Sequence, residues 1–252
     1  MAGHSKWANI KHRKGAQDKK RAKQFTRAIK EITVTVKDGN GADPETNPSL
    51  RNAISNAKGV NMPKDTIERA IKKASGADAD SYELVTFEGY GPHGIAIFVE
   101  CTTDNTNRTV ASIRSIFSKS GGSLGTNGSL EFLFDRKGVF VLDTTSIEQS
   151  TEELELELID GGALEFEKDD ELLTVYTDFV DFGKMSSKLE DLNIEPKNAE
   201  VQRIPLNTVE LPLDQAQQIL KLIDKFEEDD DVQNVYHTLD VTDELILELE
   251  NE

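Results

Sequence analysis

Residues 138–142 read GVFVL, residues 163–167 read ALEFE and residues 172–176 read LLTVY, and each run has the apolar pattern of a β-strand. Two helices and a last strand are predicted between and after these runs, over residues 146–159, 182–192 and 201–206. The order strand, helix, strand, strand, helix, strand is typical of a ferredoxin-like unit. Its two helices can cover one face of a four-stranded antiparallel sheet.

The segments on either side of this unit predict a second α+β unit. Before it, strands are expected over 82–89, 94–102 and 130–134, and a helix that begins at Asn105 or Thr106 carries Val110, Ile113 and Phe117 on its inner face. After it come a short extended segment, a helix around Ile219 and Leu220, and a strand, which are too few to form a core alone. We therefore expect them to complete the sheet of the earlier strands, which makes this domain discontinuous.

Three amphipathic helices are predicted at the N-terminal end. The first begins at Gln17 and carries an apolar stripe of Ala22, Phe25, Ile29, Ile32 and Val36. The second starts with Asn47 as N-cap and Pro48 at the first helical position, and ends near Gly59. The third follows Met62 and Pro63 and stops at Gly76.

The predicted fold class is therefore α+β, with an N-terminal three-helix domain and two α+β domains, one of them ferredoxin-like and inserted into the other. The boundaries that follow are 1–78 for the basic helical domain, 79–134 with 206–240 for the discontinuous domain and 135–205 for the inserted domain. Residues 241–252 form an acidic tail that we expect to be mobile.

Charge is strongly segregated along the chain. Residues 1–30 contain ten Lys and Arg and a single acid, Asp18, a formal charge of +9. The whole protein carries −18, so the other 222 residues carry −27. A solvated helix face would explain a basic run alone, but this degree of segregation favours a polyanion as partner. The predicted nucleic-acid-binding residues are Lys6, Trp7, Lys11, His12, Arg13, Lys14, Lys19, Lys20, Arg21, Lys23 and Arg27.

Trp7 has two interpretations. Its ring could stack on a base, or it could attach the N-terminal arm to the helical domain, which is the preferred interpretation.

The composition favours a cytoplasmic protein. No apolar run approaches the roughly 18–20 residues of a membrane helix, and residues 1–30 contain no apolar core of a secretory signal. Cys101 is the single cysteine, which excludes an intrachain disulfide and fits a reducing compartment. A reactive thiol is conceivable, but Cys101 follows an apolar strand and is expected to be a small buried side chain.

Catalytic and cofactor motifs are weak. Gly89, Gly91 and Gly94 match G-x-G-x-x-G in letters only, because a strand rather than a helix follows them. The loop 121–128 could present backbone N–H groups to a phosphate, although loop closure is the more common use of such glycines. The histidines show no zinc spacing. No cofactor, metal or small-molecule substrate is therefore expected, and the chain is not expected to be an enzyme.

One arrangement keeps an enzyme among the alternatives. Asp104 with Glu88 and Glu100 could assemble a carboxylate cluster for metal-dependent hydrolysis. Asp104 equally suits a position beside a helix N-cap, which is the more common role of such a residue.

Several motifs carry a family resemblance that covers nearly the whole chain. They are AGHSKW (2–7), NIKHRK (9–14), NMPKD (61–65), EGYGP (88–92), TDN (103–105) with NRT (107–109), and the glycine-rich segment 121–129. With these motifs the sequence resembles the YebC/PmpR family, which is related to the mitochondrial translational activator of cytochrome c oxidase. The resemblance implies three domains, a cytoplasmic location and a probable transcriptional regulator that binds DNA. It also implies an alternative role in translation, with ribosome binding and relief of stalling at proline-rich stretches.

The basic arm cannot separate DNA from RNA, because phosphate contacts carry no sequence information. The first expectation is a DNA-binding transcriptional regulator. The alternative is a translation factor whose arm binds ribosomal or transfer RNA, and the third is an enzyme that uses the Asp104 region. In each case we expect a monomer.

Overall fold

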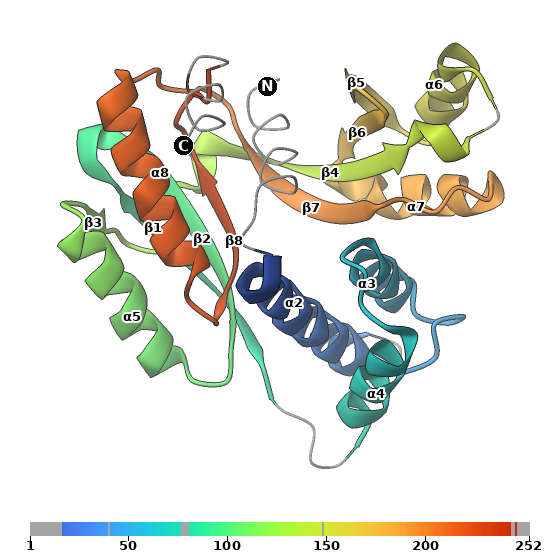
Figure 1. The fold of residues 1–252 in the computed structure, drawn as a ribbon, viewed down its shortest axis with the longest axis horizontal. Coiled ribbons are helices and arrows are strands. Elements are labelled where there is room, and N and C mark those ends of the chain that lie inside the picture. Colours follow the sequence, from blue (N-terminus) through green and yellow to red (C-terminus); the bar gives the residue numbers. More distant parts are fainter. Residues whose placement is uncertain (1–16, 40, 77–80, 148, 243–244, 246–252) are drawn as a thin grey trace. The chain divides into compact units, whose positions relative to one another are not determined.

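The computed structural model describes residues 17–39, 41–76, 81–147, 149–242 and 245, with side chains from Arg21 onward. Over these residues the chain forms two compact units (Figure 1). One contains Ser81–Asp135 and the chain from Ile204, and the other contains the N-terminal helices and Arg136–Arg203. Each unit is thus built from two separate stretches of sequence.

The N-terminal helices form as their caps and apolar stripes predict. They are α2 (Gln17–Asp38), α3 (Pro48–Gly59) and α4 (Lys64–Ala74). The side chain of Asn47 accepts a hydrogen bond from the Leu50 N–H and caps α3. Small side chains let the helices approach closely, and Ile32 of α2 is fully buried among the other core residues, which include Ala28, Leu50, Ala53, Ala57, Ile67 and Ala70.

The inserted stretch folds in the predicted order. It contains β4 (Phe134–Asp143), α6 (Thr151–Asp160), β5 (Ala163–Asp169), β6 (Leu172–Asp178), α7 (Phe182–Asp191) and β7 (Asn198–Pro205). The sheet order is β5-β6-β4-β7, and β6 pairs antiparallel with both β4 and β5. Leu154 and Leu158 of α6 and Met185 and Leu189 of α7 are buried with the apolar strand residues, so both helices share one core with the sheet (Figure 1).

The other unit joins residues that lie far apart in the sequence. Its elements are β1 (Glu83–Tyr90), β2 (Ala96–Thr103), α5 (Thr106–Lys119), β3 (Ser123–Leu124), α8 (Leu213–Glu227) and β8 (Val232–His237). The sheet order is β3-β1-β2-β8, so the C-terminal strand pairs with β2. Helices α5 and α8 pack on one face of this sheet (Figure 1). The ring centres of Phe117 on α5 and Phe226 on α8 lie 4.7 Å apart. Cys101 is buried in the same core, as predicted.

The α+β fold class is confirmed by these helices and two four-stranded sheets. The boundaries 1–78, 79–134 with 206–240, 135–205 and 241–252 remain a prediction.

Three local predictions differ from the structure. The segment 130–134 is not a strand of its own, since residues 131–133 form a 3-10 turn and Phe134 begins the long strand β4. The predicted helix 146–159 starts later, at Thr151, because Ser150 and Glu153 form a capping box there. The tail is not wholly mobile, because Val241 and Leu245 are buried in the core beside β8.

Candidate nucleic-acid interface

The predicted nucleic-acid-binding residues fall into two groups. Lys6, Trp7, Lys11, His12, Arg13 and Lys14 lie outside the described residues. Helix α2 carries the remainder, namely Lys19, Lys20, Arg21, Lys23 and Arg27, and the side chains are described from Arg21 onward. The structure thus places five of the predicted residues on one helix.

Side chains on α2 differ in their exposure. Arg21 is exposed, and its guanidinium carbon lies 5.4 Å from the centre of the Phe25 ring. This cation–π contact places Arg21 over the Phe25 ring while the residue stays exposed. Lys23 and Arg27 are partly buried and have interactions of their own. Arg21 is therefore the described residue of this group that is best placed to contact a phosphate.

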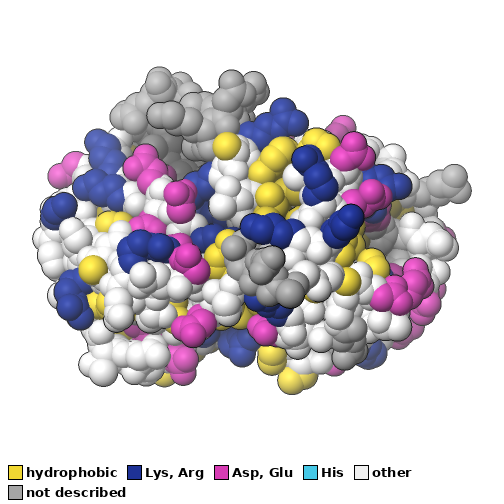
Figure 2. All heavy atoms as spheres, turned by 90° about the horizontal axis from the view of Figure 1, so that it is seen from below, with side chains coloured by type: hydrophobic (Ala, Val, Ile, Leu, Met, Phe, Trp, Pro, Cys, Tyr) yellow, Lys and Arg dark blue, Asp and Glu magenta, His cyan; other side chains and the backbone are white. Residues whose placement is uncertain are grey.

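The remaining positive charge is mixed with negative charge. On the face shown in Figure 2, Lys and Arg side chains are interspersed with Asp and Glu side chains. The described residues on that face therefore form no single basic patch. The strong excess of positive charge is a property of the first thirty residues.

Helix α2 also contains a partly buried acid, Glu31. Its carboxylate accepts a hydrogen bond of 3.0 Å from the side-chain amide of Asn56 on α3. Burial raises the pKa of the Glu31 carboxyl to about 7, while the hydrogen bond from Asn56 acts in the opposite direction and the carboxylate of Glu200 adds to the increase. Glu31 therefore changes its charge close to neutral pH.

Replacement of Glu31 with glutamine should stabilise the protein in a pH-dependent way. The pKa of Glu31 rises from 4.5 to about 7 on folding, so ionisation of this carboxyl is unfavourable in the folded state. The free energy of unfolding therefore decreases as the pH rises from about 4.5 to about 7. Glutamine keeps an acceptor for Asn56 and stays neutral. We expect a melting temperature higher than that of the wild type by roughly 2–4 °C at pH 8 for each kcal/mol regained, and no gain at pH 4. A gain of equal size at both pH values would contradict this account.

Asn56 belongs to a set of α3 residues that the sequence analysis missed. Its side-chain amide also pairs with the backbone of Ala199 on β7, accepting from the N–H at 2.9 Å and donating to the carbonyl at 3.1 Å. Arg51, Asn52, Ser55 and Lys58 on the same helix bond to α7 and to the segment before β7. The one available signal was the absence of any acidic residue from α3.

The loop 121–128 is tied down by a buried carboxylate. Glu88 is 1% exposed, and it accepts a hydrogen bond of 2.6 Å from the Gly128 N–H and one of 2.5 Å from the Leu130 N–H. The carbonyl of Glu88 accepts from the Gly125 N–H at 2.7 Å. Because these N–H groups already have acceptors, the geometry favours loop closure over phosphate binding.

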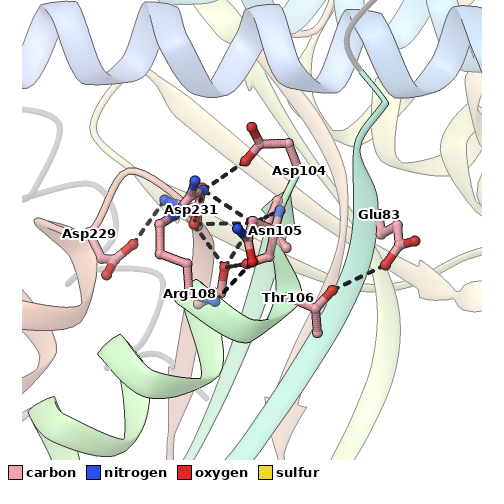
Figure 3. Close-up of polar contacts among 9 residues, drawn as sticks. Glu83, Asp104, Asn105, Thr106, Arg108, Asp229 and Asp231 are labelled. Carbon is pink, nitrogen blue, oxygen red and sulfur yellow. Dashed lines mark hydrogen bonds and ion pairs between the residues drawn. The ribbon is translucent and has the colours of Figure 1, made fainter.

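Asp104 lies in a structural cluster at the start of α5 (Figure 3). The Arg108 guanidinium donates to Asp104 and to Asp231, each at 2.8 Å, and these contacts raise the pKa of Arg108 above its usual value. Thr103 and Thr109 donate to the same Asp231 oxygen. Asp104 is thus the exposed end of a network that ties α5 to the segment before β8.

The carboxylates proposed to join Asp104 are engaged elsewhere. Glu88 binds the loop, and Glu100 accepts hydrogen bonds from Asn234 and Tyr236. Among the described residues, no group of three or more His, Cys, Asp or Glu side chains could hold a metal ion. Gly89 lies in strand β1, and residues 91–95 form the turn to β2, with a left-handed Gly94 (φ 77°). A strand rather than a helix follows the glycines, which excludes the dinucleotide-binding geometry.

Two family models match this chain, one over the N-terminal helices and one over the rest of the fold. Residues 5–77 match the model described as the TACO1/YebC protein N-terminal domain. Residues 82–239 match the model described as the TACO1/YebC second and third domain. Within the described residues, no helix is long and apolar enough to cross a membrane.

Sequence alignments with similar proteins cover almost the full length of this chain. A probable transcriptional regulatory protein of Amoebophilus asiaticus is 52% identical over 95% of this chain and 98% of its own length. One from Cytophaga hutchinsonii is 55% identical over 92% of this chain and 97% of its own. The crystal structure of a conserved hypothetical protein of Aquifex aeolicus aligns with a TM-score of 0.79 and 39% identity, and covers 91% of this chain and 95% of that one.

Proposed function

The chain belongs to the TACO1/YebC family, and from this premise we propose that it is a nucleic-acid-binding regulator of gene expression, with DNA as its partner. The observation that carries the proposal is the charge segregation, in which residues 1–30 hold ten basic residues and one acid against −27 elsewhere. The names of its relatives support a regulatory role of this kind.

The physical basis is neutralisation of phosphates. A basic segment releases counterions from a nucleic acid when it binds, whereas the acidic remainder is repelled by the same polyanion. The protein would therefore approach nucleic acid with its N-terminal end. Helix α2 begins within this basic segment at Gln17, and its buried residues Ala28, Ile32 and Val36 attach the segment to the helical core.

Replacement of Lys19, Lys20 and Arg21 with glutamine should weaken binding to all sequences alike. If each of these residues neutralises one phosphate, they contribute a slope of roughly −2.7 to the plot of log K against log salt on duplex DNA, and roughly −2.1 on single strands. Lys23 and Arg27 are left unchanged because they are partly buried. The measurement is a titration of labelled duplex DNA and single-stranded RNA at several salt concentrations.

A matched control removes the same charge from another unit. Arg114 and Lys119 on α5 and Lys221 on α8 are exposed, and their replacement with glutamine should leave the salt slope unchanged. Equal slopes for the wild type and the α2 variant would disprove phosphate contacts by these residues. Loss of binding at one DNA sequence alone would instead indicate base readout.

RNA is the partner in the alternative function. The same arm would bind ribosomal or transfer RNA through phosphates, and the protein would then be a translation factor that relieves stalling at proline-rich stretches. Sedimentation of a cell lysate through sucrose gradients of increasing salt separates the two functions. Migration with ribosomes favours translation, whereas recovery with DNA alone favours transcription.

We assign the protein no catalytic role, and we propose that it acts as a monomer in the cytoplasm. The engagement of Asp104, Glu88 and Glu100 in separate structural contacts supports the absence of a catalytic cluster. Substrate turnover that disappears in a folded Asp104→Ala variant would overturn this assignment.

A further inference from the structure

Helix α3 has one apolar face and one face rich in hydrogen-bond donors. Leu50, Ala53 and Ala57 point into the helical core. A second side of the helix, which we call the polar face of α3, consists of Arg51, Asn52, Ser55, Asn56 and Lys58. It contains no acidic residue, and these side chains are of the types that bind phosphates, sugars and base edges in nucleic-acid complexes.

Every residue of the polar face bonds to the inserted stretch of the same unit. Arg51 Nε donates to Glu190 on α7 at 2.7 Å, and Lys58 Nζ donates to Glu195 at 2.7 Å. Ser55 donates to the Pro196 carbonyl at 3.0 Å. The two basic side chains of the face are thus neutralised by carboxylates.

Asn52 and Asn56 complete this interface. Asn52 lies 3.4 Å from the Ser186 hydroxyl, and Asn56 pairs with both backbone groups of Ala199. Because β7 is the last strand of its sheet, Asn56 caps a free strand edge. The inserted stretch therefore offers α3 anionic oxygens and hydrogen-bonding groups, and a nucleic acid offers both through its phosphates, sugars and bases.

The interface is polar and partly exposed. The buried apolar residues of the helices and those of the inserted sheet form two separate clusters. The side chains in the two ion pairs are 31–61% exposed. Exposed ion pairs contribute little net stability and weaken with salt, and polar interfaces within a chain resemble transient ones. Such an interface can open at low cost.

We propose that the polar face of α3 is a second nucleic-acid-binding surface. The inserted stretch occupies this surface through Glu190 and Glu195 until a polyanion displaces these carboxylates. This proposal rests on the proposed function, because the basic arm that would bind the nucleic acid precedes α3 in the same N-terminal helical segment. In the docked state Glu190 and Glu195 take the place of phosphates on Arg51 and Lys58. Displacement would exchange these carboxylates for phosphate oxygens.

Gly59 provides a way to open the interface without changing any charge. A Cβ atom at this position would lie 2.0 Å from the Lys197 carbonyl oxygen, so the two stretches could not remain in contact there. Gly59 is the last residue of α3, and alanine is a better helix former than glycine. Gly183 on α7 is the matched control, because a Cβ there meets nothing within 4 Å.

The experiment compares Gly59→Ala, Gly183→Ala and the wild type by two measurements. Amide hydrogen exchange at Ala199 reports the docked state directly, because its N–H donates to Asn56. Titration with labelled duplex DNA and single-stranded RNA reports affinity. If about one wild-type molecule in ten is undocked, Gly59→Ala should bind about tenfold more tightly, with faster exchange at Ala199, while Gly183→Ala matches the wild type.

Wild-type protein gives an independent test that requires no variant. A saturating oligonucleotide should accelerate exchange at Ala199 while leaving protection within α8 unchanged. Unchanged exchange at Ala199 in the saturated complex would overturn the proposal, and so would faster exchange in Gly59→Ala without tighter binding. If neither protein binds either oligonucleotide at low salt, the proposed function itself fails, which is a distinct result.

Discussion

Replacement of Glu88 with alanine is expected to lower the free energy of unfolding by roughly 2–6 kcal/mol. The carboxylate is almost fully buried and is the acceptor for the Gly128 and Leu130 N–H groups. Its removal would leave both backbone donors without an acceptor, at about 1–3 kcal/mol each. The amide hydrogens of Gly128 and Leu130 should then exchange faster than in the wild type.

Chemical denaturation of Glu88→Ala beside Glu131→Ala measures this effect. Glu131 is exposed at the start of the turn before β4, and its removal should change stability by less than about 0.5 kcal/mol. Equal stability of the two variants would show that the carboxylate does not hold the loop. In that case phosphate binding by the loop would again be an open alternative.

Replacement of Asp231 with alanine should destabilise the protein by about 3 kcal/mol. One oxygen of this carboxylate accepts from Thr103, Thr109 and Arg108, and the side chain is only 9% exposed. Its loss would remove the acceptor of the Thr103 hydroxyl and the less exposed carboxylate partner of Arg108. Thr109 would keep the Asn105 carbonyl as an acceptor. The connection between α5 and the segment before β8 should loosen (Figure 3).

Asp104→Ala is the control for this prediction. Asp104 shares Arg108 with Asp231, but it is 57% exposed, so its removal should cost less than about 1 kcal/mol. Thermal unfolding of both variants measures the difference. A larger loss for Asp104→Ala than for Asp231→Ala would contradict the arrangement in which Asp231 is the centre of the network.

Local signals were sufficient to predict the helices near the N-terminus. Asn47 and Pro48 mark the start of α3, and the Phe25/Ile29/Ile32 stripe marks the buried side of α2, because caps and periodicity act over a few residues. The pairing of the C-terminal strand with β2 could also be inferred. Residues 213–237 have too few apolar side chains for a separate core, and they required the earlier strands as partners.

Contacts between distant segments could not be predicted in this way. Glu31, Asn56 and Ala199 are brought together from α2, α3 and β7, and no spacing in the sequence indicates that meeting. The same reason explains why the structural role of Glu88 was not predicted. The sequence suggested only a possible carboxylate cluster with Asp104 and Glu100, whereas the hydrogen-bond partner Gly128 lies about forty residues later in the chain.

Boundary errors have a local physical cause. The predicted helix 146–159 was placed too early because its apolar pattern begins before the cap. Asp143 accepts hydrogen bonds from Thr145 and stabilises a 3-10 turn over 144–146, and the Ser150–Glu153 box then starts α6. Side-chain to backbone competition of this kind decides helix ends and is only weakly visible in periodicity.

The central claim is that the basic N-terminal arm contacts nucleic acid, and ultraviolet crosslinking of the full chain in living cells tests it most directly. After nuclease trimming, mass spectrometry identifies the peptides that carry a nucleotide, and treatment with DNase or RNase before recovery separates the two partners. The account predicts crosslinks concentrated in residues 1–30, with a second group on α3 if the inserted stretch is displaced. Crosslinks confined to the unit built from Ser81–Asp135 and the chain from Ile204, or the absence of any crosslink, would contradict it.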